Sequence, residues 1–144
     1  MRTLALLLCG TVLSGCSLFG SDFEIDFEVE VLDVRTVQEP GGAVVVCEVV
    51  VTATATGQDG ELGTFGESDW ILRRRTDGSV YLGETRSAAA MAFFFGADKI
   101  GAGESIRSAI IENRADTEFD WEFVFFYRKP GGSRGDQALT ITCA

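Results

Sequence analysis

Residues 22–31, DFEIDFEVEV, alternate between acidic and apolar side chains without a break. Successive side chains of a pleated strand point to opposite faces, so this period of two predicts a β-strand with one buried and one solvated face. After Val31 the phase slips, because Leu32 is also apolar. We predict a β-bulge at that point, and we expect the acidic face to resist edge-to-edge pairing with a second copy.

Further segments have the composition of strands. Residues 43–56 are strongly apolar, and residues 118–128 repeat the alternation with aromatic side chains on one face. Pro-Gly-Gly at 40–42 and Asp-Gly at 77–78 favour tight turns between strands. Residues 86–103 fit either a short helix or a loop. The other predicted strands are 69–75, 79–85, 105–112 and 137–143.

Short strands separated by turn signals at near-regular spacing are typical of a two-sheet fold. We therefore predict an all-β, immunoglobulin-like β-sandwich of about seven or eight strands. The sequence shows no internal repeat and no second domain.

The N-terminus has the pattern of a targeting segment. Arg2 precedes an apolar run from Leu4 to Leu13, which is too short to span a bilayer and has the size of a signal-peptide core. The residues Leu13-Ser14-Gly15-Cys16 follow, and they resemble the lipobox of bacterial lipoproteins. The alternative is an ordinary secretory signal, with Cys16 an incidental thiol.

The lipobox resemblance implies that residues 1–15 are a cleaved signal peptide and that Cys16 carries fatty acyl chains such as palmitate. Residues 16–22 would then form a lipidated cysteine with a short tether, and residues 23–144 the folded domain. Two or three acyl chains hold a protein stably on a membrane. The expected location is the cell envelope, anchored to the outer membrane or to the outer face of the plasma membrane. In Gram-negative lipoproteins an aspartate after the lipidated cysteine favours retention in the inner membrane, so Ser17 at this position favours the outer membrane.

The chain has four cysteines, and this interpretation leaves two of them in the mature domain. Cys9 leaves with the signal and Cys16 is acylated, so Cys47 and Cys143 can pair in an oxidising compartment. Both face inward by the alternation of their strands. We predict a Cys47–Cys143 disulfide, with two separate buried thiols as the alternative.

Charge and composition argue against several functions. Residues 1–15 hold one base and no acid, so their loss changes the formal net charge from −10 to −11. So acidic a chain is not expected to bind nucleic acid. The absence of histidine removes the commonest general base and metal ligand. We expect no catalytic residues, cofactor, metal site or small-molecule substrate; acids near residues 59–61 and 116–120 lack the spacing of a calcium loop.

Two clusters are candidate interaction residues. Phe93, Phe94 and Phe95 are consecutive and cannot all enter one small core, so at least one is expected to be exposed. The alternative is that this segment packs across an open end of the sandwich. Arg73, Arg74 and Arg75 form the second candidate, with a solvated strand end as the alternative. Trp70 is predicted to be a core residue set against the disulfide, with a ligand platform as the alternative.

A diffuse resemblance covers roughly residues 27–143. It rests on Trp70-Ile71-Leu72, Asp77-Gly78, Tyr81, Ala102-Gly103-Glu104-Ser105, the apolar segment 106–111 and Phe125-Phe126-Tyr127. This order is similar to the telokin-like, immunoglobulin-type domain of unknown function found in many bacterial lipoproteins. The family's usual proline before the Gly-Glu pair is Ala102 here. The resemblance implies a fold and an envelope setting, and no catalytic residues.

These observations predict a lipid-anchored, non-catalytic binding or interaction module with an envelope protein as its partner. One alternative is an inhibitor of a secreted hydrolase such as a protease or lysozyme, with residues 57–68 or 86–103 projecting as a wedge. Another is a purely structural envelope component that self-associates.

Overall fold

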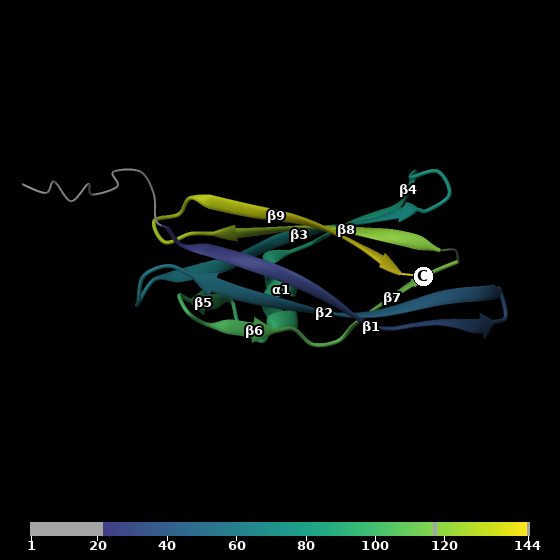
Figure 1. Cartoon of the computed structure of the whole chain (residues 1–144), viewed down its shortest axis with the longest axis horizontal. Coiled ribbons are helices and arrows are strands. Elements are labelled where there is room, and N and C mark those ends of the chain that lie inside the picture. The colour runs from purple at the N-terminus through teal and green to yellow at the C-terminus, as the bar shows by residue number, and fades with distance from the viewer. Residues whose placement is uncertain (1–21, 117, 144) are drawn as a thin grey trace, which may run out of the picture.

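Two antiparallel β-sheets face each other in the computed structural model, which describes residues 22–116 and 118–143 (Figure 1). The described residues form nine strands and one short helix, so the all-β two-sheet prediction is confirmed. The predicted signal peptide, Cys16 and the tether up to residue 21 lie outside the described residues. The first sheet contains β1 (Glu24–Glu39), β2 (Gly42–Thr56), β6 (Ser105–Arg107) and β7 (Ile111–Ala115). The second contains β3 (Leu62–Arg74), β4 (Val80–Arg86), β5 (Lys99–Gly101), β8 (Phe119–Arg128) and β9 (Arg134–Cys143).

The first sheet is built on a long hairpin. β1 pairs with β2 from Glu24 opposite Thr56 to Glu39 opposite Gly42, and the turn lies where the sequence predicted it. The register shifts between Val31 and Asp33, which confirms the predicted bulge. β2 then pairs with β6 and β7 on its other side, which leaves β1 at the edge of the sheet.

The second sheet has the order β4-β3-β8-β9, with β5 also paired to β3. β3 begins at Leu62, seven residues before the predicted strand. The sequence did not predict this part of the strand, because Gly63 and Gly66 interrupt the alternation of apolar and polar residues. Both positions need a residue without Cβ: a Cβ at Gly63 would overlap the ring of Phe23, and one at Gly66 would lie 2.7 Å from the Phe126 carbonyl oxygen.

The strand predicted at 105–112 is two shorter strands, β6 and β7. The break is at Ser108, which is buried and bonds to Val51 twice. Its backbone N–H donates to the Val51 carbonyl (2.8 Å), and its hydroxyl accepts from the Val51 N–H (3.0 Å). A side chain therefore replaces one rung of the ladder. Together with the unpredicted strand β5, this division gives nine strands rather than seven or eight.

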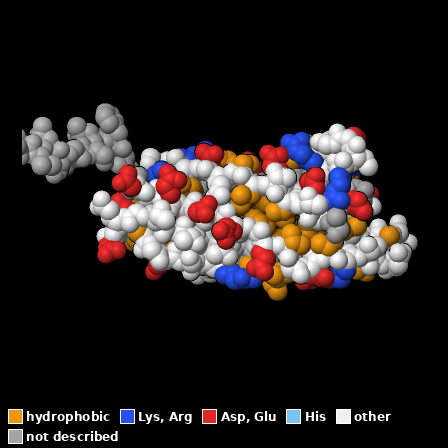
Figure 2. Space-filling model, in the orientation of Figure 1, with side chains coloured by type: hydrophobic (Ala, Val, Ile, Leu, Met, Phe, Trp, Pro, Cys, Tyr) orange, Lys and Arg blue, Asp and Glu red, His pale blue; other side chains and the backbone are white. Residues whose placement is uncertain are grey.

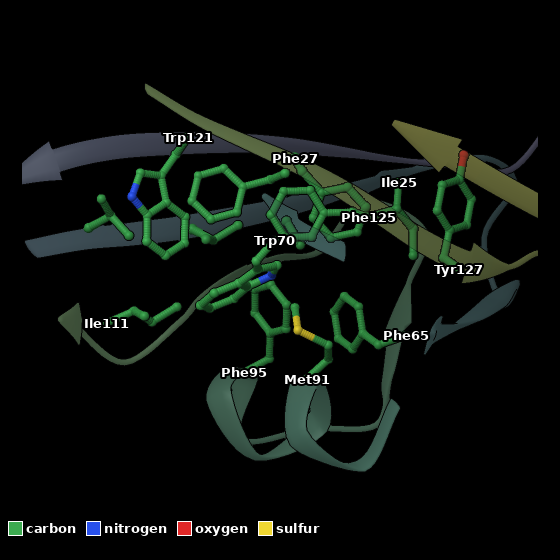
Figure 3. Close-up of a cluster of buried hydrophobic side chains, with 14 of the residues drawn as sticks. Ile25, Phe27, Phe65, Trp70, Met91, Phe95, Ile111, Trp121, Phe125 and Tyr127 are labelled. Atoms are coloured by element: carbon green, nitrogen blue, oxygen red, sulfur yellow. The ribbon is translucent and has the colours of Figure 1, made fainter. Parts of the chain in front are cut away.

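Residues 86–103, which fitted either a helix or a loop, contain the helix α1 (Ala88–Phe95). Ser87 caps its N-terminus by accepting from Ala90 N–H, and Gly96 ends it in the left-handed conformation at φ 69°. Met91 and Phe95 enter the core, so the helix covers one open side of the sandwich (Figures 1 and 3). No helix in residues 22–116 and 118–143 is long and apolar enough to cross a membrane.

Aromatic side chains fill the space between the sheets (Figure 3). Phe27 of β1 stacks on Phe125 of β8 with ring centroids 4.5 Å apart, and Phe65 stacks on Phe95 at 4.4 Å. Trp70 is buried, as predicted. The inward face of β8 thus meets the inward face of β1, the two segments in which the sequence showed its clearest alternation.

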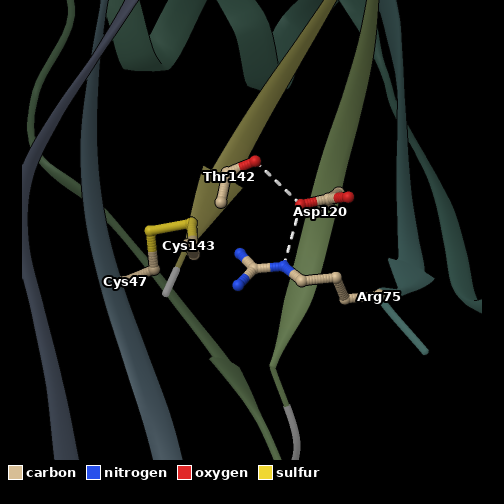
Figure 4. The surroundings of a disulfide bond; sticks show 5 residues. All are labelled: Cys47, Arg75, Asp120, Thr142 and Cys143. Atoms are coloured by element: carbon tan, nitrogen blue, oxygen red, sulfur yellow. Dashed lines mark hydrogen bonds and ion pairs between the residues drawn. A yellow bond between two sulfur atoms is a disulfide. The ribbon is translucent and has the colours of Figure 1, made fainter.

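The predicted disulfide joins the two sheets (Figure 4). Cys47 lies on β2 and Cys143 at the end of β9, with a Cα–Cα distance of 6.0 Å. Both residues are fully buried. The bond closes a sequence separation of 96 residues, so it links an early strand to the last one.

Candidate functional site

A groove lined by both apolar and polar side chains lies between two sheet edges. β1 is the edge of the first sheet and β9 the edge of the second, and the two strands are in contact on the side of the sandwich away from α1. The groove has a volume of about 520 Å³. Figure 2 shows a band of apolar side chains along the molecule, bordered by acidic ones. The lining residues are Asp26, Phe27, Glu28, Val29, Gln137, Leu139, Thr140 and Ile141. We call this the β1–β9 groove.

Gln137 of β9 bonds to the backbone of β1 at one end of this groove. The Phe27 N–H donates to Gln137 Oε1 (2.7 Å), and Gln137 Nε2 donates to the Phe27 carbonyl oxygen (3.1 Å). The carboxamide thus takes the place of one peptide group of a neighbouring strand. Backbone groups alternate in direction along an antiparallel strand, so those of Val29 point towards the groove as those of Phe27 do.

The rim of the β1–β9 groove carries negative charge without a matching cation. Glu24 pairs with Lys129 (3.1 Å) and Glu30 with Arg107 (2.9 Å). Between them on the same face of β1, Asp26 and Glu28 form no ion pair with any residue in the described part of the chain. Both side chains are exposed. The lining of the groove therefore combines four apolar side chains with two carboxylates that form no ion pair in the described residues.

A second hollow, of about 370 Å³, lies beside the start of α1. Two arginines line it, but both are already engaged. Arg134 lies over the ring of Phe126 at 3.9 Å and pairs with Glu67, and Arg128 donates to the Gly132 carbonyl oxygen. This surface offers less free charge than the β1–β9 groove.

The structure separates the three consecutive phenylalanines of the first predicted cluster. Phe95 is buried against Phe65, and Phe94 stacks on Trp70 with centroids 5.8 Å apart. Phe93 is 82% exposed. The helix turns each ring in a different direction, so two of them cover the side of the sandwich and one faces solvent.

The three arginines of the second cluster each have an intramolecular partner. Arg73 pairs with Glu122 (2.9 Å), and Arg74 lies over the ring of Tyr81 (5.0 Å). Arg75 pairs with Asp120 (3.5 Å), as Figure 4 shows. These arginines stand at the end of β3 and do not line the β1–β9 groove.

Tyr81 also connects this region to the end of β7. A hydrogen bond to the Asp116 carboxylate raises the pKa of the Tyr81 hydroxyl above its usual value.

Two of the acids considered for calcium accept hydrogen bonds within the fold. Glu61 accepts a hydrogen bond from the Gln58 N–H (2.8 Å), and Asp120 accepts one from the Thr142 hydroxyl (2.9 Å). Within residues 22–116 and 118–143, no three His, Cys, Asp or Glu side chains converge as a set of metal ligands.

The sequence did not point to the groove residues of β9. Leu139 and Ile141 have the alternation of a strand, but nothing in the sequence says that β9 is an edge strand beside β1. Gln137 has no sequence signal at all, because its hydrogen-bond partner is 110 residues away. On β1, the acidic alternation did identify Asp26 and Glu28 as one solvated face.

Comparisons with known proteins give the fold alone. No protein-family model matches the chain, and no curated protein matches it. The structure is similar to that of the putative ApaA protein from Bordetella pertussis, with a TM-score of 0.60, 13% identity, and coverage of 85% of this chain and 94% of that one. It is also similar to structural genomics target SoR45, with a TM-score of 0.59, 10% identity, and coverage of 83% and 86%.

Proposed function

We propose that this protein is a lipid-anchored cell-envelope protein whose β-sandwich is a non-catalytic binding module, with the β1–β9 groove as its contact site. The observation that carries this proposal is the groove itself: two sheet edges lie side by side over partly buried apolar side chains. Uncovered sheet edges are recurrent sites for binding an extended segment of another chain. The Cys47–Cys143 disulfide is consistent with an extracytoplasmic location.

The finer assignments belong to the same proposal. The domain would be a telokin-like, immunoglobulin-type sandwich, and Cys16 would be the acylated first residue of the mature protein, favouring the outer membrane. The short tether would hold the groove close to the membrane surface, where the partner would be another envelope protein.

The anchor has a direct test in the change Cys16→Ser. This variant should appear in the soluble fraction, because the serine hydroxyl is not acylated and an ordinary signal peptide leaves no lipid behind. Cys9→Ser is the matched control and should stay with the membranes, since Cys9 lies within the predicted signal. Membrane retention of Cys16→Ser would contradict the lipoprotein assignment.

The contact site has a separate test by photo-crosslinking in cells. A photoreactive phenylalanine at Thr140, which is exposed on the groove wall, should join the protein to a discrete partner. The same group at Ala89, exposed on α1, is the comparison position. A partner joined from Ala89 and not from Thr140 would move the contact surface to α1 and Phe93.

The hydrolase-inhibitor alternative expects a projecting wedge at residues 57–68 or 86–103. Residues 62–68 are part of β3, and residues 88–95 form the packed helix α1, so most of both expected wedges lies in packed elements. The alternative of a self-associating structural component is disfavoured at β1, because Asp26 and Glu28 would repel the same acids of a second copy.

A further inference from the structure

We propose that the occupant of the β1–β9 groove is an extended segment of a partner protein in which apolar residues alternate with lysine or arginine. The segment would add to the β1 edge as a strand. This inference rests on the proposed binding function and specifies the chemistry of the partner.

The backbone of β1 supplies the first argument. At Phe27 a carboxamide, which has the donor and acceptor of a peptide group, bonds to both backbone groups of the edge. At Val29 the edge has the same direction, and Leu139, two residues beyond Gln137 on β9, also lines the groove. A peptide group placed beside Val29 would continue the pairing that Gln137 begins.

The groove lining supplies the second argument. Val29, Leu139 and Ile141 are each only partly buried, and all three pack against the main core. Every second side chain of an added strand would point to this lining, because side chains alternate between the two faces of a strand. Apolar residues at those positions would remove the exposed apolar surface from water.

The charge of the rim supplies the third argument and sets the sign of the partner. Asp26 and Glu28 are two residues apart on one face of β1, a separation of roughly 6.6 Å along a strand. This equals the spacing between alternate side chains of an extended partner. Basic side chains on this face of a strand paired at Val29 would lie near these carboxylates, and the net charge of −10 would attract them at long range. A second copy of β1 would bring acids to the same place.

The test measures peptide binding by the full-length chain in detergent micelles. The probe is a fluorescein-labelled peptide of sequence Thr-Lys-Val-Lys-Val-Lys-Thr. Its binding is measured by fluorescence anisotropy at low salt. One comparison peptide has glutamate in place of lysine, and a second keeps the lysines but carries N-methyl groups on its valines. We expect the lysine peptide to bind, the glutamate peptide not to bind, and N-methylation to weaken binding at least tenfold by removing backbone donors.

Variants of the rim separate the groove from general electrostatic attraction. Asp26→Asn with Glu28→Gln should weaken binding of the lysine peptide at least tenfold. Asp59→Asn with Asp98→Asn removes the same charge from exposed acids that do not line the groove, and should change the affinity less than twofold. Circular dichroism checks that both double variants keep the fold.

Any of these results would overturn the inference: no binding of the lysine peptide, equal losses in the two double variants, or full binding of the N-methylated peptide. A dimer that the Asp26 and Glu28 changes strengthen would identify a second copy as the occupant and would also overturn it. If a partner is joined from Thr140 but the lysine peptide does not bind, the proposed function is supported and the added strand is contradicted. Peptide binding without any partner joined from Thr140 would support the added strand and would contradict the groove as the contact site for an envelope partner.

Discussion

Reduction of the Cys47–Cys143 bond should lower the free energy of unfolding by about 4 to 5 kcal/mol. The bond spans 96 residues, so its loss restores a large part of the conformational freedom of the unfolded chain. It is also the covalent link between β2 and β9, strands of opposite sheets. Urea unfolding with and without dithiothreitol, followed by tryptophan fluorescence, measures the difference.

The double variant Cys47→Ala with Cys143→Ala provides the matched comparison. It should unfold at the same urea concentration as the reduced protein and should not respond to dithiothreitol. Each single variant leaves one thiol in a fully buried position, and each should also lose most of the stabilisation. Equal stability of oxidised and reduced protein, or two thiols titratable in the unreduced unfolded domain, would contradict this account.

Substitution of Phe27 by alanine should destabilise the fold by about 3 to 5 kcal/mol. The ring is 1% exposed, stacks on Phe125, and lies within 6.4 Å of the rings of Phe65, Phe95 and Tyr127, centroid to centroid. Its removal would open a cavity at the point where β1, β3, β8 and α1 meet. Urea unfolding gives the change in free energy.

Phe93→Ala is the matched control, since it removes the same ring from a position that is 82% exposed. It should alter the free energy of unfolding by less than about 0.5 kcal/mol. Phe27→Leu keeps most of the apolar volume and should lose less than Phe27→Ala, which preserves the test if the alanine variant does not fold. Similar losses for Phe27→Ala and Phe93→Ala would show that the aromatic core is not centred on Phe27.

Sequence reasoning succeeded where the signal was local. The alternation from Phe23 to Val31 predicted both the strand and its bulge, because a period of two and its interruption can be read from neighbouring residues. The inward direction of Cys47 and Cys143 followed from the alternation within their own strands, and the structure joins them in a disulfide.

The unpredicted parts depend on contacts between residues distant in sequence. The strand that begins at Leu62 was missed because its alternation is broken by Gly63 and Gly66. These positions need glycine because a Cβ would clash with the Phe23 ring or the Phe126 backbone. The interruption at Ser108 depends on its bonds to Val51, 57 residues away. Each is a tertiary contact that overrides the local pattern.

The candidate site divides in the same way. By itself the sequence determined that this is a β-rich, acidic chain with an alternating first strand and a pair of inward cysteines, since side-chain alternation and charge are properties of neighbouring residues. Only the tertiary structure decided that β1 and β9 are both edges, that they lie side by side, and that Gln137 reaches Phe27 while Asp26 and Glu28 stay unpaired. The physical reason is that strand order and sheet edges arise from packing two whole sheets together, a property that no single segment carries.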